Sequence, residues 1–160
     1  MNSGFVPILE TPDRGGKYGQ KHYLLFESRI IMDYLESAFP EQPLYRPDPL
    51  QRAEQHYIMS IFDSMQAAMY GFIMTRGEVD SIVATLAKAF DKLELFLEKS
   101  KTDYFQDSET YTMVDLYGFP HTSRIFYLKD SALEDLYIKF AFEQKYPNLH
   151  KWFKKILAQP

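Results

Sequence analysis

The side chains that could do chemistry are few in this 160-residue sequence. It contains no cysteine, which excludes a cysteine nucleophile, a thiolate metal site and a disulfide framework within these residues. No Gly-x-Ser-x-Gly motif marks a nucleophilic serine. We assign no metal, because the histidines lack a ligand spacing such as His-x-x-x-His, and we assign no catalytic residue. The histidines are His22, His56, His121 and His150.

Two polar pairs stand where helices are expected to begin. Glu27-Ser28 precedes an apolar repeat of helical spacing, and Ser28 is suited to the N-cap with Glu27 as a nearby acid. Thr112 and Asp115 form a capping-box pattern in which Asp replaces the commoner Glu or Gln. We interpret the second pair as a folding signal and not as catalytic acids.

The elements around the first pair predict a β-hairpin followed by a helix. Residues 5–10 are short, apolar and β-branched, with a proline near the start, and residues 21–26 are similar. A Gly- and Pro-rich turn over residues 11–20 joins them. Apolar residues from Ile30 to Phe39 then recur at helical spacing, and Pro40 ends that helix.

The rest of the sequence predicts helices. We expect a segment at 1–40, a stiff proline-rich linker at 41–49 and an all-helical domain at 50–160. Asp48-Pro49 marks the first helix of that domain, since Asp caps and Pro suits the first helical position. Apolar stripes predict helices over residues 50–73, 82–97 and 131–144, and further helices after Thr112 and after Pro147. Pro120 is expected to kink the helix that follows Thr112. Residues 99–110 are expected to form a polar loop.

Composition sets the broad class. Hydrophobic residues make up 46% and charged residues 25%, which is typical of a globular protein. The net charge of −4 gives no basic footprint for nucleic acid. No apolar run reaches the ~18–20 residues of a membrane span, and no secretory signal is recognised at the start. The default expectation is a soluble cytoplasmic protein.

The aromatic residues are open to two interpretations. Tyr57, Phe62, Tyr117 and Tyr127 either line an apolar groove for a small molecule or belong to the core. Helical spacing favours the core, because aromatic side chains are more often buried.

Three groups of residues together resemble the glutathione transferase family over nearly the whole sequence. The first group comprises Val6-Pro7, Glu27-Ser28 and Phe39-Pro40. The second is the linker from Pro43 to Asp48-Pro49, followed by Arg52-Ala53. The third comprises Thr112-Met113-Val114-Asp115, Pro120, Arg124, Tyr146-Pro147-Asn148-Leu149 and Trp152. The spacing of Met, Asp, Pro and Arg in the third group is most similar to the omega class.

The resemblance implies a thioredoxin-like segment, followed by the family's all-α domain, with glutathione as substrate. It implies a cis peptide before Pro7, with the backbone at Val6 and Pro7 pairing with the cysteinyl part of glutathione. Glu27 would accept from the ligand's ammonium group, and Ser28 would hold its carboxylate beside backbone N–H groups. A co-substrate cleft would include Tyr57, Tyr117 and Arg124, although Arg124 could instead form a surface salt bridge.

The resemblance also implies the chemistry and its partners. Members of the family carry out glutathione-dependent thiol transfer or reduction, or conjugate glutathione to electrophiles in detoxification. The partners expected are therefore a small electrophile or disulfide substrate and a second copy of the chain in a homodimer.

The sequence departs from the family at its start. The family begins with strand, helix, strand and helix before Val-Pro, and that part carries the residue that meets the glutathione sulfur, a cysteine in the omega class. We therefore expect half of one domain plus the whole of the other, with little or no activity. We expect the strand at residues 6–10 to have an open edge, held loosely or covered by a partner. The alternative is a non-catalytic protein-interaction module of transferase-like fold.

Overall fold

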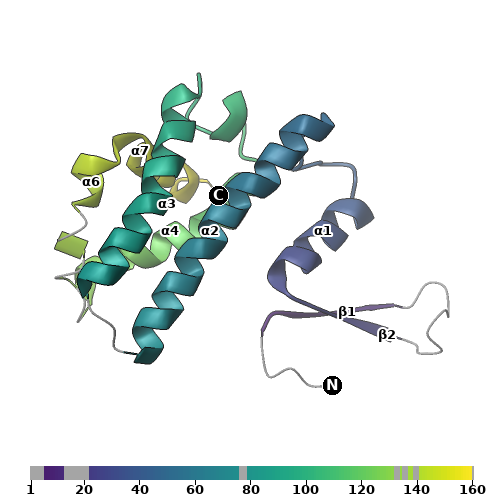
Figure 1. Cartoon of the computed structure of the whole chain (residues 1–160). Coiled ribbons are helices and arrows are strands. Elements are labelled where there is room, and N and C mark those ends of the chain that lie inside the picture. The colour runs from purple at the N-terminus through teal and green to yellow at the C-terminus, as the bar shows by residue number, and fades with distance from the viewer. Residues whose placement is uncertain are drawn as a thin grey trace. The chain divides into compact units, whose positions relative to one another are not determined.

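A computed structural model describes residues 6–12, 22–75, 79–131, 134, 137–138 and 141–159. The chain divides into two compact units, Met1–Leu44 and Tyr45–Pro160, and each is considered by itself (Figure 1). The mainly helical architecture predicted from the sequence, a hairpin and helix followed by a helical bundle, is confirmed. Among the helices described, none combines the length and apolar character needed to cross a bilayer.

The first unit is a two-stranded antiparallel hairpin followed by one helix. Its elements are β1 (Ile8–Pro12), β2 (His22–Phe26) and α1 (Ser28–Ala38). The predicted hairpin is confirmed, but β1 begins at Ile8 rather than at residue 5, since Pro7 has no N–H to donate to a ladder. The strand also extends through Thr11 and Pro12, which were expected in the turn. Phe5, Lys21 and the turn over 13–20 lie outside the described residues.

Two hydrogen bonds join α1 to the rest of this unit. The Thr11 and Tyr34 hydroxyls are 2.7 Å apart and join β1 to α1. The Glu36 carboxylate accepts from the Leu44 N–H at 3.0 Å, which ties the end of the unit to α1. Ile31 is the single buried apolar side chain among the residues of this unit that the structure describes.

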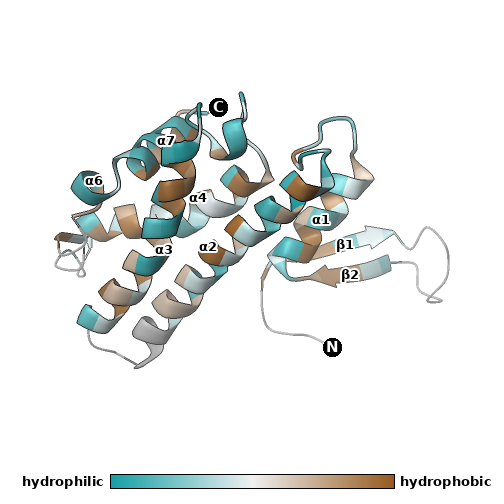
Figure 2. Cartoon of the chain, turned by 45° about the horizontal axis from the view of Figure 1, so that its top comes forward, coloured by the Kyte–Doolittle hydropathy of each residue, from teal (hydrophilic) through white to brown (hydrophobic). Residues whose placement is uncertain are grey.

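The second unit is a helical bundle. Its long helices are α2 (Pro49–Thr75) and α3 (Val79–Lys99), which pack side by side. The helix α4 (Met113–Phe126) packs on α2, and α7 (Pro147–Leu157) packs on α3 and α4 (Figure 1). Figure 2 shows hydrophilic and hydrophobic residues alternating along α2 and α3, as expected of helices that bury one side. The helix start at Asp48-Pro49 is confirmed, because the Asp48 carboxylate accepts from the Gln51 N–H at 2.9 Å.

Aromatic side chains form the centre of the bundle. Phe62 and Trp152 are completely buried, and their rings stack with centroids 6.2 Å apart. The Phe105 ring packs edge-on against Trp152 at 5.5 Å. The Phe62 ring also lies so close to Gly118 that a Cβ atom there would overlap it. Phe62 is therefore core, as the helical spacing favoured.

The start of α4 is fixed by the predicted capping box, which is confirmed. The Asp115 carboxylate accepts from the Thr112 N–H at 2.6 Å and from the Trp152 indole N–H at 2.7 Å. Burial raises the pKa of Asp115, while these hydrogen bonds oppose that shift. The structural role assigned to Thr112 and Asp115 from the sequence agrees with these contacts.

Several sequence expectations for this unit were wrong in detail. Leu50 was placed in the apolar stripe of α2, yet it is 78% exposed because it lies at the helix start. The polar loop at 99–110 contains the 3-10 helix η1 (Phe105–Asp107), whose Phe105 is buried.

The helix expected over 131–144 is also interrupted. The 3-10 helix η2 (Tyr127–Asp130) precedes it, and the left-handed backbone of Ala141 (φ 43°) separates off the short α6 (Phe142–Lys145). Leu133, Leu136 and Phe140, expected to face inward, lie outside the described residues.

Candidate functional site

The hairpin register brings the N-terminal candidates to one place. Ile8 pairs with Phe26 in the last matched position of the β1–β2 ladder. Pro7 directly precedes Ile8, Glu27 directly follows Phe26, and Val6 and Ser28 are the next residues outward. The four residues therefore share the end of the hairpin from which α1 starts (Figure 1).

The strand side of this site is a short stretch of backbone that precedes the ladder. The Val6–Pro7 peptide bond is cis, which confirms the expectation from the resemblance. The Val6 side chain is 90% exposed, and Pro7 is exposed as well. Because pairing with β2 begins only at Ile8, the peptide groups of Val6 are not used by that ladder.

The helix side of the site consists of Glu27 and Ser28. The prediction that Ser28 is the N-cap was wrong: Glu27 is the capping residue, and Ser28 is the first residue of α1. The Glu27 backbone has φ 69°, a conformation that non-glycine residues rarely adopt. The chain turns sharply at Glu27 from strand into helix. Because of that turn, the helix starts one residue earlier than predicted, with Glu27 and not Ser28 at the N-cap.

Among the residues of this unit that the structure describes, none caps the α1 N-terminus with its side chain, and the first turn of α1 contains no acidic residue. Both Glu27 and Ser28 are exposed. A helix N-terminus without such partners attracts an anion through its N–H groups and dipole.

Together these groups can recognise a charged peptide. The α1 N-terminus with the Ser28 hydroxyl suits a carboxylate, and the adjacent Glu27 carboxylate suits an ammonium group. The backbone at Val6, which lies outside the β1–β2 ladder, suits an extended peptide. This arrangement suits binding, because the Glu27 and Ser28 side chains are exposed and available to a ligand. Within the described part of the chain, no group of three His, Asp or Glu side chains is placed to hold a metal.

The C-terminal candidates lie in the second unit, where Tyr117 joins a polar cluster between α2 and α4. Its hydroxyl donates to the Asp63 carboxylate, and only 8% of the residue is exposed. The neighbouring His121 ring lies 2.9 Å from the Gln66 amide oxygen and 2.8 Å from the Tyr117 carbonyl oxygen. Burial is the largest cause of a lowered pKa for His121, and the Arg124 charge adds to it.

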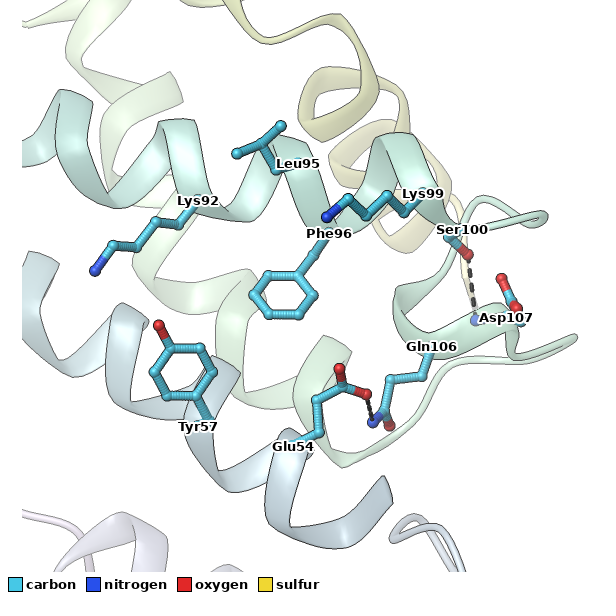
Figure 3. Close-up of a pocket in the computed structure, with 9 residues that line it drawn as sticks. All are labelled: Glu54, Tyr57, Lys92, Leu95, Phe96, Lys99, Ser100, Gln106 and Asp107. Atoms are coloured by element: carbon cyan, nitrogen blue, oxygen red, sulfur yellow. Dashed lines mark hydrogen bonds between the residues drawn. The ribbon is translucent and has the colours of Figure 1, made fainter. Parts of the chain in front are cut away.

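Arg124 and Tyr57 are both exposed, in different places. Arg124 lies in the last turn of α4, on the helix that carries Tyr117. Tyr57 is 52% exposed and packs edge-on against Phe96 of α3 at 6.1 Å. It lines a cavity to which neither Tyr117 nor Arg124 contributes (Figure 3). Arg124 and Tyr117 therefore lie on the same helix, whereas Tyr57 lies at a different place in the bundle. Tyr127, the remaining aromatic candidate, is 66% exposed and is not a core residue.

The sequence analysis missed three members of the polar cluster, namely Asp63, Gln66 and His121. A signal was available, since Asp63 and Gln66 are polar residues three apart within the apolar pattern of α2. His121, four residues after Tyr117, lies one turn along α4. Reading these spacings as one shared helix–helix contact would have identified the cluster.

Comparison with known proteins identifies relatives along the whole chain. A glutathione S-transferase C-terminal domain family model matches residues 63–160. The chain is 31% identical over 160 residues to glutathione S-transferase omega-1 from Sus scrofa, covering 99% of this chain and 59% of that protein. It is 27% identical to a probable glutathione transferase omega-2 from Caenorhabditis elegans, covering 98% of this chain and 60% of that protein. The chain therefore spans about three fifths of the length of these curated relatives.

Solved structures of similar fold agree with this relationship. A maleylacetoacetate isomerase from Anaeromyxobacter dehalogenans, solved with bound glutathione, has a TM-score of 0.72 at 19% identity, covering 98% of this chain and 68% of that one. A glutathione S-transferase from Legionella pneumophila has a TM-score of 0.67 at 20% identity, and the match covers 99% of this chain and 78% of that one. Since the family model covers well over half of the sequence and the matched relatives are omega transferases, this chain belongs to the glutathione S-transferase family.

Proposed function

We propose that this chain binds glutathione at Val6, Pro7, Glu27 and Ser28. The observation that supports this most is the hairpin register, which pairs Ile8 with Phe26 and so brings cis-Pro7 and Glu27 to the end of the hairpin where α1 starts. The γ-glutamyl ammonium would be held by Glu27 and its carboxylate by Ser28 with the helix N-terminus. The backbone of Val6 would pair with the cysteinyl part.

The reaction class proposed is glutathione-dependent thiol transfer or reduction, or conjugation to a small electrophile. Such chemistry requires a group that stabilises the glutathione thiolate. The 160 residues contain no cysteine, and no residue matches the family's sulfur-contacting position. We therefore propose that these residues supply recognition of glutathione and, by themselves, little or no turnover.

Calorimetric titration with glutathione tests the binding site. Glu27→Gln should weaken binding by roughly 1.5–3 kcal/mol, the range for hydrogen bonds to charged groups, and Ser28→Ala should weaken it less. Glu41→Gln and Ser37→Ala are matched controls, because both residues are exposed and lie outside the site. Unchanged affinity in Glu27→Gln would remove Glu27 from the site.

Assays with chlorodinitrobenzene and with dehydroascorbate test the reaction separately. We expect rates close to the uncatalysed background for the purified chain. Turnover comparable to that of an intact family member would contradict the proposed division between recognition and chemistry. Such turnover would not change the conclusion from the calorimetric titration about glutathione binding.

We further propose that Tyr117 and Arg124 face the co-substrate, that the chain forms a homodimer, and that it is cytoplasmic. The Tyr117 cluster with Asp63 and His121 supports the first, since it fixes polar groups beside an exposed cation. Light scattering after gel filtration tests the dimer, for which a monomer mass would be contrary evidence.

A further inference from the structure

The His121 ring lies between two oxygen atoms, one at each of its nitrogens. Its Nδ1 atom is 2.8 Å from the Tyr117 carbonyl oxygen, one turn earlier on α4, and its Nε2 atom is 2.9 Å from the Gln66 amide oxygen of α2. A neutral imidazole carries a single N–H and therefore donates on one side only. One of the two contacts must therefore change when the ring gains or loses a proton.

The contact with Tyr117 stays the same in both protonation states. A backbone carbonyl oxygen can only accept, so Nδ1 carries a proton whether the ring is neutral or charged. The neutral ring then has a lone pair at Nε2, which the Gln66 amide oxygen cannot satisfy. Because a buried polar atom without a partner is costly, the change falls on Gln66.

The surroundings allow the Gln66 amide to turn and hold the His121 ring in place. The ring centroids of Phe62 and Tyr117 lie 6.0 Å and 5.0 Å from that of His121, and only 9% of His121 is exposed. Gln66 is half-buried, and the terminal torsion of a glutamine has a broad, roughly two-fold energy profile. A half-turn of this amide exchanges its oxygen and its NH2 group at the position that faces Nε2.

Two charged residues act on the ring in opposite directions. Asp63, one turn before Gln66 on α2, raises the pKa of His121, whereas Arg124 of α4 lowers it together with burial, the largest cause. The helices η2 and α7 also pack on α4, but the charges that reach the ring come from Asp63 and Arg124. Tyr117 is the other titratable side chain against the ring, and its hydroxyl donates to Asp63. The ring is therefore expected to be neutral near pH 7.

We propose that His121 and Gln66 form a proton-controlled amide switch at the contact between α2 and α4. With His121 neutral, the Gln66 NH2 group donates to Nε2, and the amide oxygen is at the end away from the ring. With His121 protonated, Nε2–H donates to the amide oxygen, and the NH2 group is at the end away from the ring. Protonation thus converts the outer end of Gln66 from an acceptor into a donor.

The switch does not depend on glutathione or on a co-substrate. If a co-substrate contacts the cluster that holds Tyr117, the switch sets whether Gln66 offers it an acceptor or a donor. That consequence rests on the proposed function, whereas the switch itself does not. Measurements on the chain without any ligand therefore test the switch alone.

NMR of the isotope-labelled full chain between about pH 8 and about pH 5 tests the proposal. At the upper pH, the ring nitrogen shifts of His121 should show a proton on Nδ1 and none on Nε2. As the pH falls, the signals of the Gln66 side-chain NH2 group should move with the same midpoint as the His121 ring, below about pH 6.5. A proton on Nε2 of the neutral ring, or Gln66 signals that stay unchanged while His121 titrates, would overturn the proposal.

The variant Gln66→Glu removes the donor from the switch. A carboxylate offers Nε2 acceptors only and favours the charged ring, so the His121 midpoint should rise by about one pH unit or more. Gln144→Glu adds the same charge at an exposed position of α6 and should leave that midpoint unchanged. Equal midpoints in the two variants, or a His121 ring that stays neutral at about pH 5 in Gln66→Glu, would also overturn the proposal. If Gln66→Glu does not fold, the protonated ring nitrogen of the wild type at about pH 8 decides alone.

Discussion

The two units of this chain are stabilised to very different degrees by the residues described. In the second unit, Phe62, Phe90, Phe105 and Trp152 are completely buried. Among the described apolar residues of the first unit only Ile31 is buried, while Val6, Leu24, Ile30 and Phe39 are each about half exposed or more. A two-stranded hairpin is marginal without further cover. The comparison teaches that the proposed glutathione site lies in the unit with the smaller described core, and that the helical bundle holds most of the buried apolar side chains.

Hydrogen exchange should show the largest difference between the units. We expect amides of β1 and β2 to exchange at least about 100-fold faster than core amides of α2 and α4, since local opening costs least where little is buried. Adding glutathione should slow exchange at the β2–α1 junction and leave the bundle unchanged. If the hairpin and the bundle were equally protected from exchange in a monomer, the two units would not differ in stability as we infer.

Removing the buried carboxylate should have the next largest effect. Asp115→Ala leaves the Trp152 indole and the Thr112 N–H without their acceptor, so we expect a loss of about 3 kcal/mol in the free energy of unfolding. Urea unfolding followed by the fluorescence of Trp152, the only tryptophan, measures it. Glu98→Ala, at an exposed position of α3, is the control. A loss below that of the control would show that the capping box is dispensable.

Overfilling the core should cost somewhat less. In Gly118→Ala the new methyl group would overlap the buried Phe62 ring, and we expect a loss of about 2 kcal/mol. The sign of the change in the free energy of unfolding is informative, because a Gly→Ala substitution at an exposed helix position stabilises a protein. Phe62→Leu in the same chain should recover part of the loss. Failure of this rescue would argue against the overlap as the cause.

A hydrogen bond in the first unit should matter locally and only slightly. Tyr34→Phe removes the contact with the Thr11 hydroxyl, and the expected loss is about 1 kcal/mol in the local opening of β1. Exchange of β1 amides should quicken while the Trp152-monitored transition stays unchanged. A shift of that transition would mean that the units unfold together.

The smallest expected effect is on pH dependence. Burial lowers the pKa of His121, so the unfolded chain binds a proton more readily than the folded one below about pH 6.5. Stability should therefore fall as the pH drops from 6.5 towards the lower folded pKa. Urea midpoints for wild type and His121→Asn measure this, and the variant should show the flatter slope. Identical slopes would exclude His121 as the source.

The sequence predicted those features that depend on local pattern. The hairpin, the start of α2 at Asp48-Pro49 and the capping box at Thr112 each follow from residue types at short spacing. Features that depend on tertiary contact were not predicted. The Asp63–Tyr117 hydrogen bond joins residues 54 apart in the chain, and the left-handed backbone of Glu27 is imposed by the strand-to-helix turn.

The backbone of Glu27 sets folding against recognition. At φ 69° a glycine would be relaxed where a glutamate is strained, so Glu27→Gly should make the turn easier to form. The same change would delete the carboxylate proposed to meet the ligand. Selection for stability of the first unit would thus favour glycine at this position, whereas selection for ligand binding would favour glutamate. The glutamate found there is the residue expected if ligand binding was the stronger requirement.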